Sequence, residues 1–176
     1  MQTALHPTVP AGVSTTYFLE LTLTDHGRVI DRNVYWLSTK PDQIDFDNTI
    51  GEGSGAEFVP GGYADLTGLQ QLASADVRAG AHSHRDGSDV VTTVTTVTIR
   101  NVSHRPTVGF LLRADVRRST GGDNQVLPIR WSQNDVTLWP GESQTITARY
   151  AASELRGTAP KVTITGWNTP TTTIPG

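Results

Sequence analysis

The chain has 176 residues and a formal net charge of −3 at pH 7, from 14 basic and 17 acidic side chains. This balance argues against a nucleic-acid-binding protein, which usually presents a basic face. The absence of cysteine excludes a disulfide framework and thiolate chemistry. No apolar run approaches the ~18 residues of a membrane-spanning helix, so we do not expect a membrane as a partner. Because of the charge balance, we do not expect nucleic acid as a partner either.

The composition favours β-structure. Threonine (26) and valine (16) dominate the chain, and β-branched side chains pack well on a pleated surface. Met1–Ser14 lacks periodicity, and we interpret it as a linker or an edge segment. The first clear strand is Thr16–Asp25, in which every second residue is apolar. A short loop over Asp25–Gly27 then leads to a return strand over Arg28–Ser38.

The middle of the chain is less regular. Acids, glycines and a proline in Asp42–Gly62 predict an irregular excursion. Leucines three apart at 66, 69 and 72, with Asp65 able to cap, predict a short helical turn lying under the sandwich edge. Alternation over Val77–Ala81 indicates a further strand.

Two valine-rich segments follow. In Val90–Val102 the apolar residues change from even to odd positions, which predicts a β-bulge near Thr95-Thr96 if the core face is kept. Val108–Val116 gives the cleanest alternation in the chain, with charged residues on its second face.

The segment Val126–Tyr150 predicts two strands joined by a tight turn. Pro140-Gly141 fits a type II turn, because proline presets φ at the second position and glycine accepts a positive φ at the third. A hairpin of this kind needs a second sheet to cover its apolar face. Lys161–Trp167 is the last predicted strand, and Thr169–Gly176 is predicted to be a linker or a frayed end. Together, the pattern predicts one antiparallel sandwich of seven to nine strands over residues 15–168.

Four segments, in order along the chain, resemble one family. They are NVYWLSTKPDQIDFDN (33–48), YADLTGL (63–69), VLPIRWSQNDVTLWPGESQTITARY (126–150) and VTITGWN (162–168). They are similar to the C-terminal immunoglobulin-like domain of exo-β-D-glucosaminidases, which are chitosan-degrading enzymes of glycoside hydrolase family 2. The resemblance implies an immunoglobulin-like β-sandwich belonging to a secreted enzyme, with other domains of the parent glycosidase as its partners. It also implies that the catalytic acids lie in a separate barrel domain, since no position here matches them. Met1–Gly12 does not resemble a signal peptide, so we expect a signal to lie outside this fragment.

The acidic residues do not predict catalysis by this chain. A retaining glycosidase needs two carboxyl groups about 5–5.5 Å apart, one of them with a raised pKa. Glu142 follows a turn, Asp115 is expected on the wet face of a strand, and Asp45 and Asp47 are expected in a loop. We interpret them as solvated acids. We therefore expect no catalytic residue, and we expect the isolated chain to be inactive.

Metal and cofactor sites are weakly indicated. His82 and His84, with Asp86 and Asp89 nearby, could supply metal ligands, but no further ligand has a compelling spacing. Asp45–Asn48 lacks the regular loop of a calcium site. We interpret both as ordinary surface and expect neither a metal nor a cofactor.

The four tryptophans leave two interpretations open. An aromatic ring in a sandwich belongs more often to the core or to a domain interface, which we favour for Trp36 and Trp139. Trp131 and Trp167 lie near predicted strand ends and are candidates for sugar stacking. The leading expectation is a structural accessory domain of the parent enzyme. The alternative is a carbohydrate-binding module that binds chitosan, chito-oligosaccharide or a related polysaccharide.

Overall fold

The computed structural model describes residues 8–50, 57–86, 89–121 and 124–176. It consists of antiparallel strands with two short 3-10 helices, and it divides into two compact units, Met1–Gln71 and Leu72–Gly176. Within the described ranges, no helix is long and apolar enough to cross a membrane.

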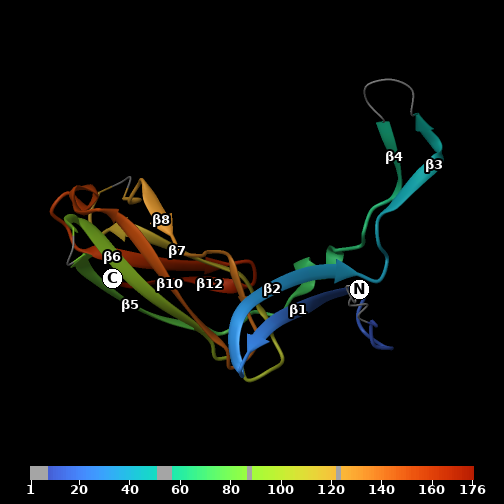
Figure 1. Ribbon diagram of the computed structural model, residues 1–176, viewed down its shortest axis with the longest axis horizontal. Helices are drawn as coiled ribbons and strands as arrows, with labels where there is room; N and C mark the ends of the chain where they lie inside the picture. The colour runs from blue at the N-terminus through green and yellow to red at the C-terminus, as the bar shows by residue number, and fades with distance from the viewer. Residues whose placement is uncertain (1–7, 51–56, 87–88, 122–123) are drawn as a thin grey trace. The chain divides into compact units, whose positions relative to one another are not determined.

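The first unit opens with a long hairpin (Figure 1). Strands β1 (Thr16–Asp25) and β2 (Arg28–Ser38) pair antiparallel, as the alternation predicted. The two-residue loop between them has positive φ at both His26 (47°) and Gly27 (78°). A loop of this kind matches the right-handed twist of the flanking strands, so the predicted loop is confirmed.

The predicted irregular excursion is a second hairpin. Strand β3 (Gln43–Ile50) pairs with β4 (Glu57–Gly62), with register shifts along the way. The acids of β3 suggested a loop, but they alternate with Ile44 and Phe46 and so are compatible with a strand. Residues 51–56 lie outside the described part of the chain.

A short helical turn closes this unit, as predicted. Helix η1 spans Thr67–Gln71, and Leu69 is its buried residue. The carboxylate of Asp65 accepts hydrogen bonds from the Thr67 backbone N (3.2 Å) and from the Thr67 hydroxyl (2.6 Å). The side chain therefore satisfies a donor that a helix start leaves free.

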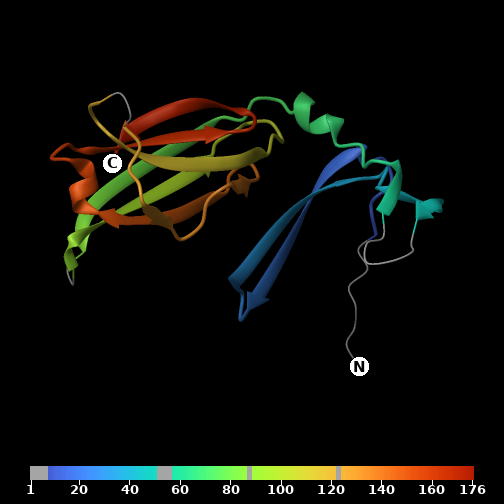
Figure 2. The same ribbon diagram turned by 90° about the horizontal axis from the view of Figure 1, so that it is seen from above.

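The second unit is a sandwich of two four-stranded antiparallel sheets, with orders β5-β6-β10-β8 and β12-β11-β7-β9. Figure 2 shows the two sheets as facing layers. The predicted seven to nine strands had included Thr16–Asp25 and Arg28–Ser38, which belong to the first unit. The sandwich instead has eight described strands. They are β5 (Val77–Asp86), β6 (Asp89–Asn101), β7 (Gly109–Arg118), β8 (Ile129–Trp131), β9 (Val136–Leu138), β10 (Ser143–Ala151), β11 (Pro160–Gly166) and β12 (Thr169–Pro175), with helix η2 (Ala152–Leu155) between β10 and β11.

The sandwich has one apolar core. Its buried side chains come from the inner faces of both sheets, and the alternation in β7 places Leu112, Ala114 and Val116 there as predicted. The core residues are Val97, Ile99, Leu112, Ala114, Val116, Val126, Val136, Leu138, Ile146, Ala148, Tyr150, Val162 and Ile164.

The predicted bulge in β6 is wrong. Pairing with both β5 and β10 runs through Thr95 and Thr96 without a register shift. From Thr93 to Ile99 the odd positions face the core, so Thr93 and Thr95 are buried where valines were expected. Val94 is on the outer face, where it lies in register between His84 and Arg149. A buried threonine keeps a strand in phase as valine does. The hydroxyl of Thr95 is hydrogen-bonded to Ser83 and Tyr150, whereas that of Thr93 has no partner among the described residues.

The sandwich has its irregularity in β7 instead. Gly109 pairs with Leu138 and Leu112 with Val136, so β7 carries one more residue than β9 over this stretch. Leu111 accommodates the extra residue with φ 49°, in the left-handed region.

The predicted hairpin in Val126–Tyr150 is also wrong in its pairing. Strand β9 belongs to the sheet of β7, whereas β10 belongs to the sheet of β6 and β8. The turn itself is confirmed: Glu142 N donates to Trp139 O (3.1 Å), and Gly141 has φ 88°. The chain therefore uses a type II turn to pass from one sheet to the other.

The last prediction to be corrected is the C-terminal tail. Thr169–Pro175 forms β12, which pairs with β11 from Lys161↔Pro175 to Gly166↔Thr169. Its prolines suggested a linker, but β12 is an edge strand, where proline is tolerated because one side of the ladder is unpaired. The sandwich therefore extends beyond residue 168, and its sheets begin at Val77 rather than near residue 15.

Candidate functional site

Trp131, a predicted stacking residue, is part of the sandwich rather than a free platform. It lies on the short edge strand β8 directly opposite Ala148, which is fully buried, so the two side chains share the inner face. The indole packs partly buried against the core. Its remaining surface lines a shallow hollow of about 340 Å³ together with Arg130, Ser132, Thr147 and Arg149.

Trp167 is the more accessible of the two candidates. It lies in the turn between β11 and β12 with 55% of its surface exposed. Its ring packs edge-on against Phe110, with centroids 6.2 Å apart and an interplanar angle of 61°. Its backbone N donates to Phe110 O (2.9 Å). The turn thus fixes the position of the indole ring while about half of the residue stays exposed to solvent.

The neighbouring Asn168 explains why this turn is fixed. Its side-chain oxygen accepts from Phe110 N (3.0 Å), and its amide nitrogen donates to Val108 O and Ala73 O (both 2.8 Å). The side chain thereby satisfies backbone groups around the irregular part of β7. Trp131 and Trp167 belong to different sheets, and the structure does not assemble them into one aromatic platform.

The other two tryptophans also differ from each other. Trp139 is partly buried at the turn that crosses between the sheets. Trp36 lies on β2 opposite Phe18 and is 41% exposed, so the core alternative does not describe it. A domain interface remains the prediction for Trp36.

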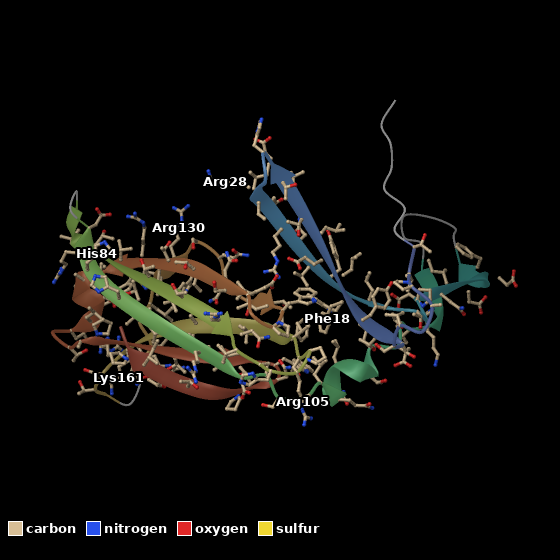
Figure 3. All side chains as sticks on the ribbon, turned by 90° about the horizontal axis from the view of Figure 1, so that it is seen from below. Phe18, Arg28, His84, Arg105, Arg130 and Lys161 are labelled. Carbon is tan, nitrogen blue, oxygen red and sulfur yellow. The ribbon has the colours of Figure 1, made fainter. Side chains whose placement is uncertain are left out.

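The outer face of the sheet β5-β6-β10-β8 is cationic, a feature that the sequence analysis missed. Arg78 lies directly opposite Arg100, and Arg130 directly opposite Arg149. Figure 3 labels Arg130 together with His84 on this sheet. We call these four arginines the arginine face. No local sequence signal reveals it, because the four arginines lie on four different strands and meet only through the strand order.

One carboxylate offsets part of this charge. Asp86 lies 2.5 Å from an Arg149 guanidinium nitrogen, an ion pair in which the acid is the less exposed partner. Like charges directly opposite each other on a sheet are destabilising. Four arginines and one acid leave three positive charges in excess on the described part of this face, although the whole chain carries −3.

The residues considered as metal ligands do not converge. His82 and His84 share the outer face of β5 and stack with ring centroids 5.8 Å apart, but Asp86 binds Arg149. The side chain of Asp89 lies outside the described residues, as does that of Asn48 in the calcium candidate. Among the described side chains, no group of three potential ligands gathers.

The acids considered for catalysis hold structural positions. Glu142 closes the crossing turn, because its carboxylate accepts from Trp139 N (2.8 Å). Asp115 lies 3.6 Å from Arg113 on the outer face of β7, and it is only 16% exposed rather than fully wet. Asp45 accepts from the backbone N of Asp47 within β3 (3.1 Å). Each of these carboxylates therefore stabilises local structure.

Comparisons with known proteins place these features in a family context. A family model described as the exo-beta-D-glucosaminidase Ig-fold domain matches residues 58–169. Exo-beta-D-glucosaminidases of Streptomyces avermitilis and Amycolatopsis orientalis are 44% and 45% identical to the chain and cover 96% of it. The crystal structure of the Amycolatopsis orientalis exo-chitosanase CsxA superposes with a TM-score of 0.83 at 41% identity, over 96% of this chain and 19% of that one. The chain spans less than a fifth of the length of these relatives, 18% and 16% for the two sequences.

Proposed function

The chain belongs to the family of exo-β-D-glucosaminidase Ig-fold domains, and from this membership we propose that it is a non-catalytic accessory part of a secreted glycoside hydrolase. The parent enzyme would release glucosamine from the non-reducing ends of chitosan and chito-oligosaccharides. The observation that carries the proposal is that whole-chain similarity corresponds to under a fifth of each relative. The remaining four-fifths leave ample length for a separate catalytic domain.

The positions of the acids support a role without catalysis. Glycoside hydrolysis needs a pair of carboxyl groups on either side of the scissile bond. Glu142 and Asp115 are instead engaged with a backbone N–H and with an arginine. In this role the sandwich would pack on the other domains of the enzyme and help to hold their arrangement.

The charge pattern favours an accessory domain over a chitosan-binding module. Chitosan is cationic, and the arginine face would repel it at the ionic strengths where surface charges act. The partly buried Trp131 cannot present a whole ring face to a sugar. Trp167 is the remaining candidate, and a single ring is a small platform compared with the successive aromatic rings that bind polymers.

The activity test compares two proteins. We expect the 176-residue chain to release no glucosamine from chito-oligosaccharides, and we expect the longer polypeptide encoded around it to do so and to be recovered from the culture medium. Turnover by the purified chain that is lost on Asp115→Asn or Glu142→Gln would contradict the non-catalytic role. A longer polypeptide without this activity would refute the proposed parent.

Retention on a chitosan column separates the accessory domain from the binding module. We expect no retention at ~0.5 M salt, where charge interactions are screened within a few Å. We expect Trp167→Ala to leave the elution volume unchanged. Retention at this salt that is lost in Trp167→Ala, and kept in a control such as Tyr63→Ala with its 80% exposed ring, would favour the binding module.

A further inference from the structure

A shallow hollow lies on the outer face of the sheet β5-β6-β10-β8, along its β8 edge. Its volume is about 340 Å³, within the range of about 300–1,000 Å³ of small-molecule sites. Figure 3 shows Arg130, which lines it, pointing away from the sandwich. We call it the Arg130 hollow, and its lining residues are Arg130, Trp131, Ser132, Thr147 and Arg149.

The strand register places the polar side chains of the hollow in two facing pairs. Arg130 lies directly opposite Arg149. Two residues further along, Ser132 N donates to Thr147 O (2.8 Å), so these two residues face each other as well. Alternate residues of a strand point to the same face, so all four side chains belong to the outer face. Directly opposite residues have Cβ atoms about 4.5–5.5 Å apart, which allows one small ligand to contact both pairs.

The two guanidinium groups have few acceptors for their positive charge. One nitrogen of Arg149 donates to Asp86 (2.5 Å). Arg130 has no hydrogen-bond or ion-pair partner within the described part of the chain. Across the sheet, the row of these arginines continues with Val94 and His84 and holds no acid. One carboxylate therefore serves two like charges that lie opposite each other, an arrangement that destabilises a sheet.

An anion held between the two arginines would remove this repulsion. The guanidinium group is planar and presents its N–H donors as a fork, which matches the two oxygens of a carboxylate. Arg130 is free to offer its whole fork, and Arg149 retains the donors that Asp86 does not use. Both arginines are exposed, so a ligand reaches them without opening the sandwich.

The other residues of the hollow favour a ligand that also carries hydroxyl groups. The Oγ of Ser132 accepts from Thr147 N (2.9 Å), which leaves its own proton free to donate. The Thr147 hydroxyl has no hydrogen-bond partner among the described residues. Both can therefore exchange hydrogen bonds with neutral hydroxyls, which a bare oxyanion does not need. The exposed part of Trp131 adds apolar surface for C–H groups.

We propose that the Arg130 hollow binds a saccharide that carries a carboxylate, with the carboxylate between Arg130 and Arg149 and ring hydroxyls on Ser132 and Thr147. The same positive charge that would repel chitosan attracts such a ligand. The hollow is shallow, so we expect a Kd for one sugar unit on the order of 1 mM or weaker. The inference goes beyond the proposed function and does not depend on it, because every residue of the hollow lies within Leu72–Gly176.

An NMR titration of the isotope-labelled 176-residue chain tests the site. Four probes are added at equal ionic strength: glucuronate, glucosamine, acetate and inorganic phosphate. We expect glucuronate to shift the amides of residues 130–132 and 147–149 and the guanidinium signals of both arginines. Its Kd should be at least about tenfold lower than that of glucosamine, which has a similar ring and the opposite charge, and at least about threefold lower than those of acetate and phosphate.

The probes separate the possible ligands. Glucosamine binding as tightly as glucuronate would overturn the proposal, because the arginines would then contribute nothing. Acetate or phosphate binding as tightly as glucuronate would also overturn it, because the ring would then contribute nothing. Shifts confined to residues outside the hollow would exclude this location.

Two variants with equal loss of charge test the position of the carboxylate. Arg130→Gln should weaken glucuronate binding at least about tenfold, because it removes one of the two forks. Arg100→Gln is the matched control on the same face and should change the Kd less than about twofold. Arg100 lies six residues along β6 from Val94, the partner of Arg149, which is about 20 Å and more than two screening lengths of about 8 Å at ~0.15 M salt. Equal weakening by both variants would show a general attraction to the face and would overturn the site.

A second pair of variants tests the contact with the ring. Thr147→Val should weaken glucuronate binding at least about threefold and leave acetate binding unchanged, because only the hydroxyl is lost. Thr145→Val, two residues earlier on the same face of β10 and outside the hollow, should change neither. A Thr147→Val variant that binds glucuronate as the unaltered chain does, or that loses acetate and glucuronate binding equally, would contradict the proposed position of the ring.

Discussion

Thr95 occupies a core position of β6 because its hydroxyl has partners. Its Oγ1 lies 2.7 Å from Ser83 Oγ and 2.8 Å from the Tyr150 hydroxyl, within the inner face of one sheet. Buried polar atoms are tolerated when they are hydrogen-bonded, and their methyl group packs as that of valine does. The position therefore tolerates threonine without a change of register.

Thr95→Val should lower the free energy of unfolding by about 1–2 kcal/mol, because it leaves the 3% exposed Tyr150 with its hydroxyl unpaired. Urea denaturation measures the change. Thr98→Val, at an exposed position of the same strand, is the control and should stay within about 0.5 kcal/mol. Combining Thr95→Val with Tyr150→Phe should recover part of the loss, since both partners become apolar. A double variant as unstable as the sum of the singles would contradict the hydrogen bond.

The carboxyl of Asp65 has a lowered pKa. The hydrogen bond from the Thr67 hydroxyl is the main cause, followed by the bond from the Thr67 backbone N, and the charge of Lys40 acts in the same direction. Each of these interactions favours the ionised form.

The pH dependence of helix η1 follows from this direction. Because the folded pKa lies below the ordinary value, the stabilisation is fully present above the ordinary aspartate pKa and is lost as the pH falls through the lowered one. An NMR titration should show the Asp65 carboxyl and the Thr67 amide changing together in acid, with no corresponding step above neutral pH. Thr67→Ala should return the Asp65 pKa toward its ordinary value. A Thr67→Ala variant with an unchanged Asp65 pKa would exclude the hydroxyl as the cause.

At the scale of elements, the alternation of side chains located strands but not their partners. The strands β1, β5, β7 and β11 were found because apolar residues alternate along them, and β2 was found because it follows a short hairpin loop. The alternation did not show that β9 and β10 belong to different sheets. Alternation reports only which face of a strand is buried, and both sheets bury their apolar faces in the same core. The turn type held the missing information, since two-residue hairpins prefer primed turns and a type II turn splays the strands.

The candidate site was predictable to a smaller extent. Trp131 and Trp167 both lie near the end of a predicted strand, and no neighbouring residue in the sequence indicates which of the two rings is buried. The register distinguishes them: the Ala148 pairing directs Trp131 inward, while Trp167 lies in a turn outside the ladder. The arginine face likewise depends on which strands become neighbours, and the sequence order β5, β6, β8, β10 does not give that arrangement.

Gly141 carries the next prediction. Its φ of 88° is one that side chains rarely adopt, and a Cβ there would meet no atom within 4 Å, so the expected cost is backbone strain rather than a clash with a neighbour. Gly141→Val should lower stability by about 1–3 kcal/mol, and Gly141→Ala should have a smaller effect of the same sign. Gly80→Val is the control, because Gly80 lies within β5, has equal space and is not in the positive-φ region. Equal melting temperatures for the Gly141 and Gly80 variants would exclude the strained turn.

The whole molecule shows an uneven distribution of core. Among the described residues, every buried apolar side chain except Leu69 belongs to Leu72–Gly176. Burial of apolar surface is the main favourable term in folding, so cooperative stability should be concentrated in the sandwich. The family match over residues 58–169 covers most of that unit and extends into η1 and β4 of the first one.

The last prediction concerns the fragment Leu72–Gly176. It should fold alone, with a single cooperative urea transition and the near-ultraviolet circular dichroism of packed aromatic rings. The denaturant slope m follows the surface exposed on unfolding, so it distinguishes the alternatives. If only the sandwich unfolds cooperatively, the fragment and the whole chain should have nearly equal slopes. If all 176 residues formed one cooperative unit, the slope of the whole chain should exceed that of the 105-residue fragment (176 less 71) by about 1.7-fold, the ratio of their lengths. A slope ratio near this value would mean that the first unit unfolds together with the sandwich, and a fragment without a cooperative transition would contradict an independently stable sandwich, whereas a ratio near one would mean that the strands of the first unit lack a cooperative core of their own.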